Sequence, residues 1–407
     1  MPPEPVAGLA AVGAGTWLLE PGLDFLNHGS FGACPRPVLA AQQAWRERME
    51  AQPVRFLARE LEGLLDEVRE ALAAFLGADP AGLAFVPNAT TGVATVLAGL
   101  PLRPGDELLT TTQAYPAVRK ALRRTAERTG ARVVEAEVPF PLAGPGDVIG
   151  PVLAATGPRT RLAVLDHITS PTAVVYPIEA LVKALARRGV DTLVDGAHAP
   201  GQVALNLRRL GAAYYTGNCH KWLGAPKGAA FLHVRADRRA RVAPLVTSHG
   251  FYNPRDDRAA FQLTFDWVGT LDPTAVLAVP AAIACLGGLL EGGWPALMAR
   301  NRALASLAQG LLAEALGVDR PVPEEMLPAM ASLPLPPGEE APPPGPPVPV
   351  GLQARLLDAG FELPLFPHPA GTGRLVRVSA FAYNHPAQYE RLAGWLAGAV
   401  GRPRCEA

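Results

Sequence analysis

The sequence predicts an α/β protein in which a mixed, mostly parallel sheet lies between helices and is followed by a smaller C-terminal α+β domain. Three observations carry this prediction. Short apolar runs alternate with longer helical patterns over residues 55–234. The chain has 407 residues, of which 49% are hydrophobic, so it can bury a large core. A Pro-rich stretch at residues 321–350 then precedes a final compact group of helices and strands.

The elements of the large domain follow from hydrophobic periodicity. Residues 55–76 carry apolar side chains at intervals of three and four, the spacing of one helix face. The other expected helices are residues 35–50, 88–100, 117–129, 147–156 and 177–188. The expected strands are residues 83–87, 107–111, 132–135, 161–168, 191–194 and 212–218. This order predicts parallel strands. A strand at residues 229–234 follows so closely on its predecessor that we expect it to be antiparallel.

The pattern changes after residue 234. Residues 242–267 are polar and rich in charges, which predicts an active-site or subunit-contact loop. Two long helices are expected at residues 274–290 and 295–316. The first approaches the length of a membrane span, but Pro280, Gly287 and Gly288 interrupt it, so we expect a buried or interface helix.

The smaller domain is expected to contain a Pro-rich loop, because proline fits neither a helix interior nor a central strand. Its remaining predicted elements are helices at residues 351–359 and 386–400 and strands at residues 361–366 and 374–380. The expected division is an N-terminal segment with an entrance loop (1–34), a large domain (35–290) and a small domain (291–407).

Charge and cysteine content restrict the function classes. The chain has 37 basic and 37 acidic residues, whereas binding to nucleic acid or to an anionic membrane would need a basic face. We therefore expect a small-molecule partner, with no nucleic acid and no membrane. The cysteines lie far apart without a CxxC pair, which suits neither a disulfide framework nor a zinc knuckle. The expected location is the cytoplasm, and no metal is expected.

Residues 216–228 hold two of the four lysines of the chain. Lys221 follows an apolar run that predicts a buried strand, so its amine should emerge at the carboxyl end of the sheet. Ligands bind at that edge in open α/β folds. The alternative is an ordinary surface lysine in a loop.

Two other predicted strand ends carry polar side chains. Asp195 and His198 close one strand, and Asn88 follows another at the start of a helix, whose free N–H groups could bind a phosphate. A carboxylate, a lysine and an anion site are the three features that pyridoxal phosphate (PLP) requires. Each has an alternative interpretation on its own: helix capping by Asn88 or Thr90, a structural role for Asp195, and a core or loop position for His198.

The motifs Asp195-Gly-Ala-His198 and Asn218-Cys-His-Lys221 resemble those of the class V aminotransferase superfamily, which has fold type I and uses PLP. Further motifs are similar to the isopenicillin N epimerase-like branch: they begin at Leu26, Asn88, Asp166 and Arg374. The resemblance covers nearly the whole chain.

The resemblance implies roles for residues around the cofactor. Lys221 would form the Schiff base, Asp195 would pair with the pyridine nitrogen and His198 would lie near the phenolic oxygen. Tyr115 would stack on the ring. The residues implied at the phosphate are Ala89, Thr90, Asn218 and His220, with Gly269 and Thr270 contributed by a second subunit.

The resemblance also implies a substrate site and a homodimer with a shared active site. Arg377 would bind the α-carboxylate, because its planar guanidinium suits bidentate contacts. Thr169 or Ser170 would line the substrate side of the ring, and the further candidates are Asn27, His28 and Arg55.

The expected function is a PLP-dependent reaction at the α-carbon of an amino acid or amino-acid-like substrate, similar to isopenicillin N epimerase. A C–S lyase like hercynylcysteine sulfoxide lyase and an aminotransferase remain alternatives, since a fold does not fix the reaction. From other classes, the alternatives are a zinc hydrolase that uses Asp195, His198 and His220, and a cofactor-free binding protein. Cysteine desulfurases of this fold carry a loop cysteine, but residues 321–337 contain none, so no persulfide-forming turnover is expected.

Overall fold

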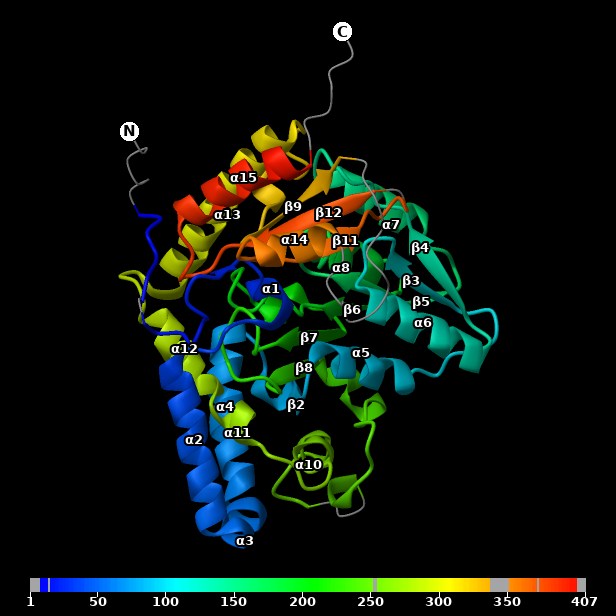
Figure 1. The fold of residues 1–407 in the computed structure, drawn as a ribbon. Coiled ribbons are helices and arrows are strands. Elements are labelled where there is room, and N and C mark those ends of the chain that lie inside the picture. Colours follow the sequence, from blue (N-terminus) through cyan, green and yellow to red (C-terminus); the bar gives the residue numbers. More distant parts are fainter. Residues whose placement is uncertain (1–7, 14, 252–254, 337–350, 372, 401–407) are drawn as a thin grey trace.

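The computed structural model describes residues 8–13, 15–251, 255–336, 351–371 and 373–400. Its centre is a seven-stranded sheet with helices on both sides (Figure 1). The strands are β2 (Leu83–Val86), β3 (Glu107–Thr111), β4 (Arg132–Ala136), β5 (Thr160–Asp166), β6 (Asp191–Asp195), β7 (Tyr214–Asn218) and β8 (Ala230–Val234). They are ordered β2-β8-β7-β6-β5-β3-β4. Only β8 runs antiparallel to its neighbours, so the predicted mixed, mostly parallel sheet is confirmed.

The central strands are apolar on both faces because helices cover both. Leu108 and Leu193 belong to a core with helices α5 (Ala89–Ala98) and α6 (Pro116–Thr129). The next residue of each strand, Leu109 and Val194, points to the opposite core. That core includes side chains of α4 (Leu61–Leu76), α7 (Gly146–Ala154) and α8 (Ile178–Ala186). The sheet is therefore buried between two helical layers, which holds its strand ends rigidly.

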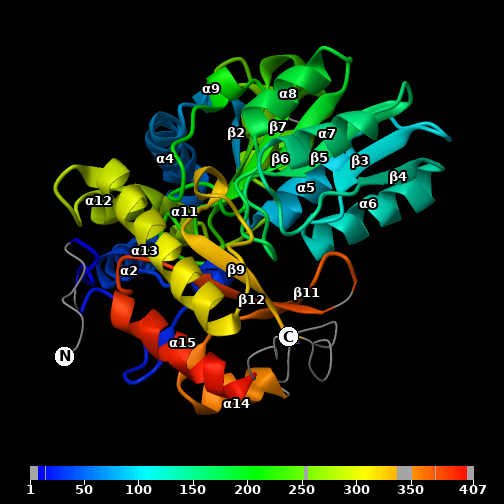
Figure 2. The ribbon, with the colours of Figure 1, turned by 90° about the horizontal axis from the view of Figure 1, so that it is seen from above.

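The C-terminal part forms a second, smaller α+β unit. Its sheet has the order β11 (Leu365–Pro367), β12 (Arg374–Ser379) and β9 (Met330–Leu335), all antiparallel. Its helices are α13 (Gly293–Leu316), α14 (Leu352–Asp358) and α15 (Pro386–Ala399). Figure 2 shows α13 and α15 side by side next to this sheet. The predicted small α+β domain is thus present.

The N-terminal segment joins the two parts. Strand β1 (Asp24–Phe25) pairs in parallel with β10 (Phe361–Glu362), and the chain then turns into α1 (His28–Phe31). Further helices are α2 (Arg36–Ala51), α3 (Pro53–Arg55), α9 (Leu207–Leu210), α10 (Ala260–Asp266), α11 (Thr274–Leu277) and α12 (Val279–Gly287). Short 3-10 turns cover Pro80–Gly82, Ala236–Arg241, His249–Phe251 and Glu324–Met326, and a π-helical turn covers Phe56–Glu60.

The sequence suggested that the Pro-rich stretch is a loop, but part of it is a strand. It contains β9, with Pro334 opposite Leu375 of β12. Strand β9 pairs with β12 alone, and an edge strand tolerates a residue without an N–H. Residues 337–350 of this stretch lie outside the described residues, as do residues 1–7 and Cys405.

Three other predicted elements also differ. The expected loop at residues 242–267 contains α10, whose Asp266 forms ion pairs with Arg69 at 2.5 Å and with Arg258 at 2.7 Å, so these charges stabilise a packed helix. The expected helix at residues 274–290 is divided into α11 and α12, because Pro280 lacks an N–H and occupies the first turn of the second helix. The expected strand at residues 361–366 is divided between two sheets.

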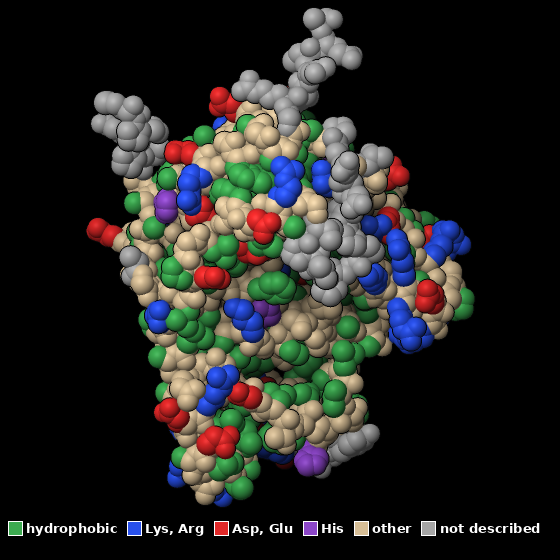
Figure 3. Space-filling model, viewed as in Figure 1, with side chains coloured by type: hydrophobic (Ala, Val, Ile, Leu, Met, Phe, Trp, Pro, Cys, Tyr) green, Lys and Arg blue, Asp and Glu red, His purple; other side chains and the backbone are tan. Residues whose placement is uncertain are grey.

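Charged side chains of both signs are interspersed on the face of the molecule seen in Figure 3. This distribution agrees with the balanced composition of the chain. Within the described residues, the helices are all too short or too polar to cross a membrane.

Candidate active site

The polar residues selected from the sequence lie at one edge of the large sheet. Strands β2, β5, β6 and β7 run in the same direction, so their carboxyl ends meet there. Helix α5 begins directly after β2, and Lys221 lies in the turn after β7. The expected convergence of three strand ends is therefore present.

Lys221 is partly buried, and its Nζ lies 3.1 Å from Nε2 of His198. Burial lowers the pKa of Lys221 to about 7, with a further lowering from the charge of Arg377 and an opposing effect of Asp195. Burial also lowers the pKa of His198 well below its usual range. A lysine with this pKa is substantially neutral at pH 7, and a neutral amine can act as a nucleophile.

Asp195 has a second buried carboxyl group beside it. Asp166 ends β5 opposite Asp195 at the end of β6, and the Ala197 N–H donates to Oδ1 of Asp195 at 3.0 Å. Burial raises the pKa of both residues, and the charge of Asp195 raises the pKa of Asp166 further. Two adjacent buried carboxyl groups resist double ionisation. Lys221 favours the ionised form of Asp195, so we assign the shared proton to Asp166.

No role for Asp166 was inferred from the sequence, although it belongs to one of the motifs. The same signal that selected Asp195 could have found it, because both are acidic residues at the end of an apolar strand.

In the first turn of α5, one residue keeps hydrogen-bond donors that have no partner among the described residues. Asn218 Oδ1 accepts the Ala89 N–H at 2.8 Å, and Asn88 Oδ1 accepts the Thr91 N–H at 2.8 Å. Asn88 is thus the helix cap, and Asn218 ties the helix to the end of β7. The N–H and hydroxyl of Thr90 take no partner among the described residues. Thr90 is therefore the residue of this turn that can donate to an anion.

His220 follows Asn218 and points one ring nitrogen at the backbone. Its Nδ1 lies 2.9 Å from the carbonyl oxygen of Ala229, which accepts the Nδ1 proton. Burial lowers the pKa of His220 to about 4. The Nε2 atom is therefore unprotonated near neutral pH.

Arg377 of β12 is fully buried and joins three segments. Its Nη1 donates to the carbonyl oxygen of Ser170 at 2.8 Å and to Oγ of Ser170 at 3.2 Å, and its Nη2 donates to Oγ of Ser30 at 3.1 Å. The guanidinium lies 4.9 Å from the ring centroid of Phe366, and Nε has no partner among the described residues. Burial lowers the pKa of Arg377 to about 10, which leaves it charged at neutral pH.

Three of the expected substrate residues form hydrogen bonds with other protein groups. His28 Nε2 donates to the carbonyl oxygen of Lys221 at 3.1 Å, while Nδ1 lies 2.8 Å from the Tyr383 hydroxyl, so both ring nitrogens are engaged. Asn27 accepts from Ser30 at 2.6 Å and donates to Glu362 at 3.1 Å. These contacts make His28 a support of the Lys221 turn and Asn27 a link between α1 and β10.

Thr169 is the third of these residues. Its hydroxyl accepts the Val174 N–H at 2.9 Å and lies 2.7 Å from the Thr172 hydroxyl within the same loop. Ser170, by contrast, accepts hydrogen bonds from Arg377, the charged group expected to bind a carboxylate.

Other predicted residues lie at the margin of the cluster. Tyr115 is 41% exposed at the start of α6. Thr270 is exposed, and no contact joins it to the cluster within the described residues. Arg55 lies in α3 and pairs with Glu60 at 3.1 Å, on the outside of the molecule.

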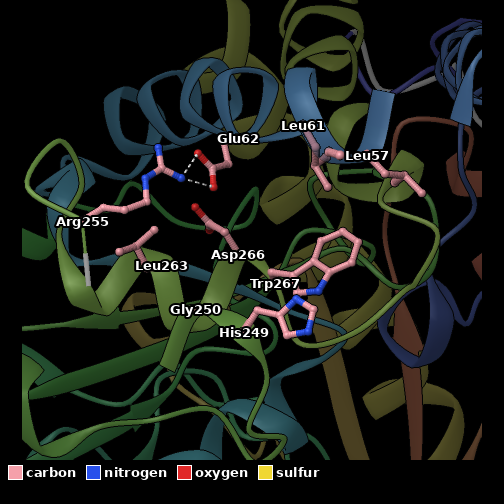
Figure 4. Close-up of a pocket in the computed structure, with 10 residues that line it drawn as sticks. Leu57, Leu61, Glu62, His249, Gly250, Arg255, Leu263, Asp266 and Trp267 are labelled. Atoms are coloured by element: carbon pink, nitrogen blue, oxygen red, sulfur yellow. Dashed lines mark hydrogen bonds and ion pairs between the residues drawn. The ribbon is translucent and has the colours of Figure 1, made fainter. Parts of the chain in front are cut away.

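A separate hollow of about 310 Å³ lies between α4 and residues 249–250 and 255–267 (Figure 4). Leu61, Leu263 and Trp267 line it, and Arg255 forms an ion pair with Glu62 at 2.9 Å beside it. It contains none of the residues predicted for the site. Among the described residues, no group of three or more His, Cys, Asp or Glu side chains is arranged to hold a metal ion.

Known proteins resemble the chain in both sequence and structure. The isopenicillin N epimerase of Amycolatopsis lactamdurans is 38% identical, over 92% of this chain and 94% of its own. The L-cysteine desulfhydrase of Arabidopsis thaliana is 32% identical, over 78% of this chain and 72% of its own. The solved complex of the cystine C–S lyase C-DES with cysteine persulfide has the same fold, with a TM-score of 0.76 at 23% identity over 93% of this chain and 98% of that one. Residues 30–340 match the aminotransferase class-V family model, and the chain therefore belongs to the aminotransferase class-V family.

Proposed function

We propose that the protein is a PLP-dependent enzyme acting at the α-carbon of an amino acid or amino-acid-like substrate. The observation that carries the proposal is the placement of Lys221, which is partly buried and has a low pKa, and the buried carboxyl group of Asp195 at neighbouring strand ends. Family membership and the isopenicillin N epimerase and L-cysteine desulfhydrase relatives support it.

The donor set of the site fits PLP. Lys221 offers an amine for the aldehyde, Asp195 offers a carboxylate for the pyridine nitrogen, and Thr90 offers donors for the phosphate. Asn218 holds the helix that presents Thr90, and His220 can add a donor when protonated. When bound, PLP supplies a protonated ring that withdraws electrons from the substrate α-carbon and acidifies its proton.

The protein groups then have separate tasks. Arg377 binds the substrate α-carboxylate with its charged, buried guanidinium group. Ser170 and Ser30 hold this group in position by accepting hydrogen bonds from it. Lys221, with its pKa near 7, takes the proton from the α-carbon and can return it. Return of a proton to the opposite face of the α-carbon would give epimerisation, departure of a β-substituent with the electron pair would give elimination, and protonation of the cofactor carbon would give transamination.

The relatives favour two of these outcomes. The epimerase relative favours return of the proton to the opposite face, and the desulfhydrase relative favours a C–S lyase. The three thiols among the described residues support direct β-elimination rather than thiol attack, because burial raises the pKa of Cys34 to about 12 and also raises the pKa of Cys219 and Cys285.

Purified protein incubated with a panel of amino acids should change optical rotation or release a keto acid, which tests the function directly. With free cysteine, any released sulfur should leave as sulfide together with pyruvate. Alanine as the product, or a persulfide trapped on a protein thiol, would contradict direct elimination. Colourless protein that leaves every amino acid unchanged would contradict a PLP enzyme.

We also propose a homodimer in the cytoplasm. Thr270 is exposed, and the neighbouring Leu271 is 53% exposed, which suits a subunit contact. The dispersed cysteines suit a reducing compartment.

Light scattering at assay concentration is expected to show a dimer. Thr270→Ala should weaken retention of PLP, measured by dialysis, without altering the secondary structure. A fully active monomer would contradict the shared site.

A further inference from the structure

Trp222 follows Lys221 in the chain and is fully buried. Its Nε1–H donates a hydrogen bond to Nδ1 of His198 at 3.3 Å. An indole N–H can donate but cannot accept. Nδ1 of His198 must therefore be the acceptor, and the proton of the neutral imidazole lies on Nε2.

This proton position fixes the direction of the next contact. Nε2 of His198 lies 3.1 Å from Nζ of Lys221, so His198 donates and Lys221 accepts. Only a neutral amine has a lone pair for this contact. The hydrogen bonds thus run in one direction, from Trp222 through His198 to Lys221.

The two turns that carry these residues fit closely together. Gly201 has φ +91°, and a Cβ there would lie 2.5 Å from the carbonyl oxygen of Trp222. Gln202 Nε2 donates to the carbonyl oxygen of His198 at 2.7 Å. On its other side, the indole packs against the rings of His28 and Phe381, with centroid separations of 5.0 Å and 5.9 Å. The packing around Trp222 and the hydrogen bond to the backbone of His198 thus fix the two side chains relative to each other.

We propose that Trp222 is a positioning residue that holds the proton of His198 on Nε2, so that His198 donates toward Lys221 and toward a cofactor oxygen beside it. Without the indole N–H, the imidazole would be free to move its proton to Nδ1 and to present an acceptor at Nε2. The consequence for turnover rests on the proposed PLP function. The position of the proton on His198 is independent of that function, because it is set by contacts between protein residues.

Histidine nitrogen NMR of the cofactor-free protein tests the proton position, with His198→Gln used to assign the signal. The wild type should show His198 protonated on Nε2, and Trp222→Phe should show a mixture or the opposite tautomer. A wild-type His198 protonated on Nδ1 would overturn the proposal without any need for a variant. An unchanged tautomer in folded Trp222→Phe would also overturn it.

Trp17→Phe is a matched control. Trp17 is also buried and packs edge-on against Phe381, at 6.0 Å, but its Nε1 has no partner among the described residues. Removing this indole N–H makes the same change in the same aromatic cluster, and it should leave His198 unaltered.

Turnover provides a second readout in the PLP-loaded enzyme. Trp222→Phe should lower kcat roughly tenfold with a smaller change in KM, a coupling typical of residues in one hydrogen-bond network. In a His198→Gln background the same substitution should have little effect, since an amide has no tautomer to fix. Equal losses in both backgrounds would show that Trp222 acts through packing alone. If the protein does not bind PLP, the proposed function fails while the NMR test still decides the inference.

Discussion

Lys221→Ala is expected to abolish turnover while leaving the protein folded. The substitution removes the amine that we assign to both cofactor attachment and proton transfer. A positioned proton-transfer group alone contributes up to about 10⁴-fold in rate. The variant should also lack the visible absorbance of the lysine–cofactor linkage. Absorbance, circular dichroism and turnover measured on one preparation check all three expectations.

Lys227→Ala is the control for this experiment. Lys227 lies in the same 216–228 stretch but donates to the carbonyl oxygen of Gly32. It should therefore retain the visible absorbance. Borohydride reduction followed by peptide mapping should label Lys221, and a label on Lys227 would refute the assignment.

Asp195→Asn is expected to lower kcat by roughly 10³-fold, the size of effect found when one preorganised electrostatic partner is removed. An asparagine has the same shape but no charge with which to hold a proton on the pyridine nitrogen. The fold should survive, because the new amide oxygen can still accept the Ala197 N–H that Asp195 accepts at 3.0 Å. Removing the charge of Asp195 also removes the repulsion that disfavours ionisation of Asp166. Steady-state kinetics and the thermal midpoint measure both effects.

Asp191→Asn is the matched control, because Asp191 begins the strand that Asp195 ends. Its carboxylate pairs with Arg238 at 2.6 Å, at the end of β6 opposite to the site. This variant should keep wild-type turnover. Equal losses in the two variants, or normal turnover in Asp195→Asn, would rule out the role given to Asp195.

Several fold elements could be predicted because their physical cause is local. The period of three and four in α4 and the two-sided apolar strands are properties of neighbouring residues. The break at Pro280 is local as well, whereas the course of β9 and the packing of α10 depend on partners elsewhere. Pro334 is acceptable in a strand only because β9 lies at a sheet edge, and Asp266 is acceptable in a packed helix only because Arg69 and Arg258 reach it.

The sequence by itself determined that Lys221 and Asp195 would lie near each other. Each follows or ends an apolar strand, and strands in parallel order bring their carboxyl ends to one edge. Only the tertiary structure decided what the surrounding polar groups do. His28 is bound to Tyr383, 355 residues away, and Arg377 to Ser170, 207 residues away, so their contacts could not be inferred from local spacing. The low pKa of Lys221 likewise arises from burial, which depends on all the segments that close around it.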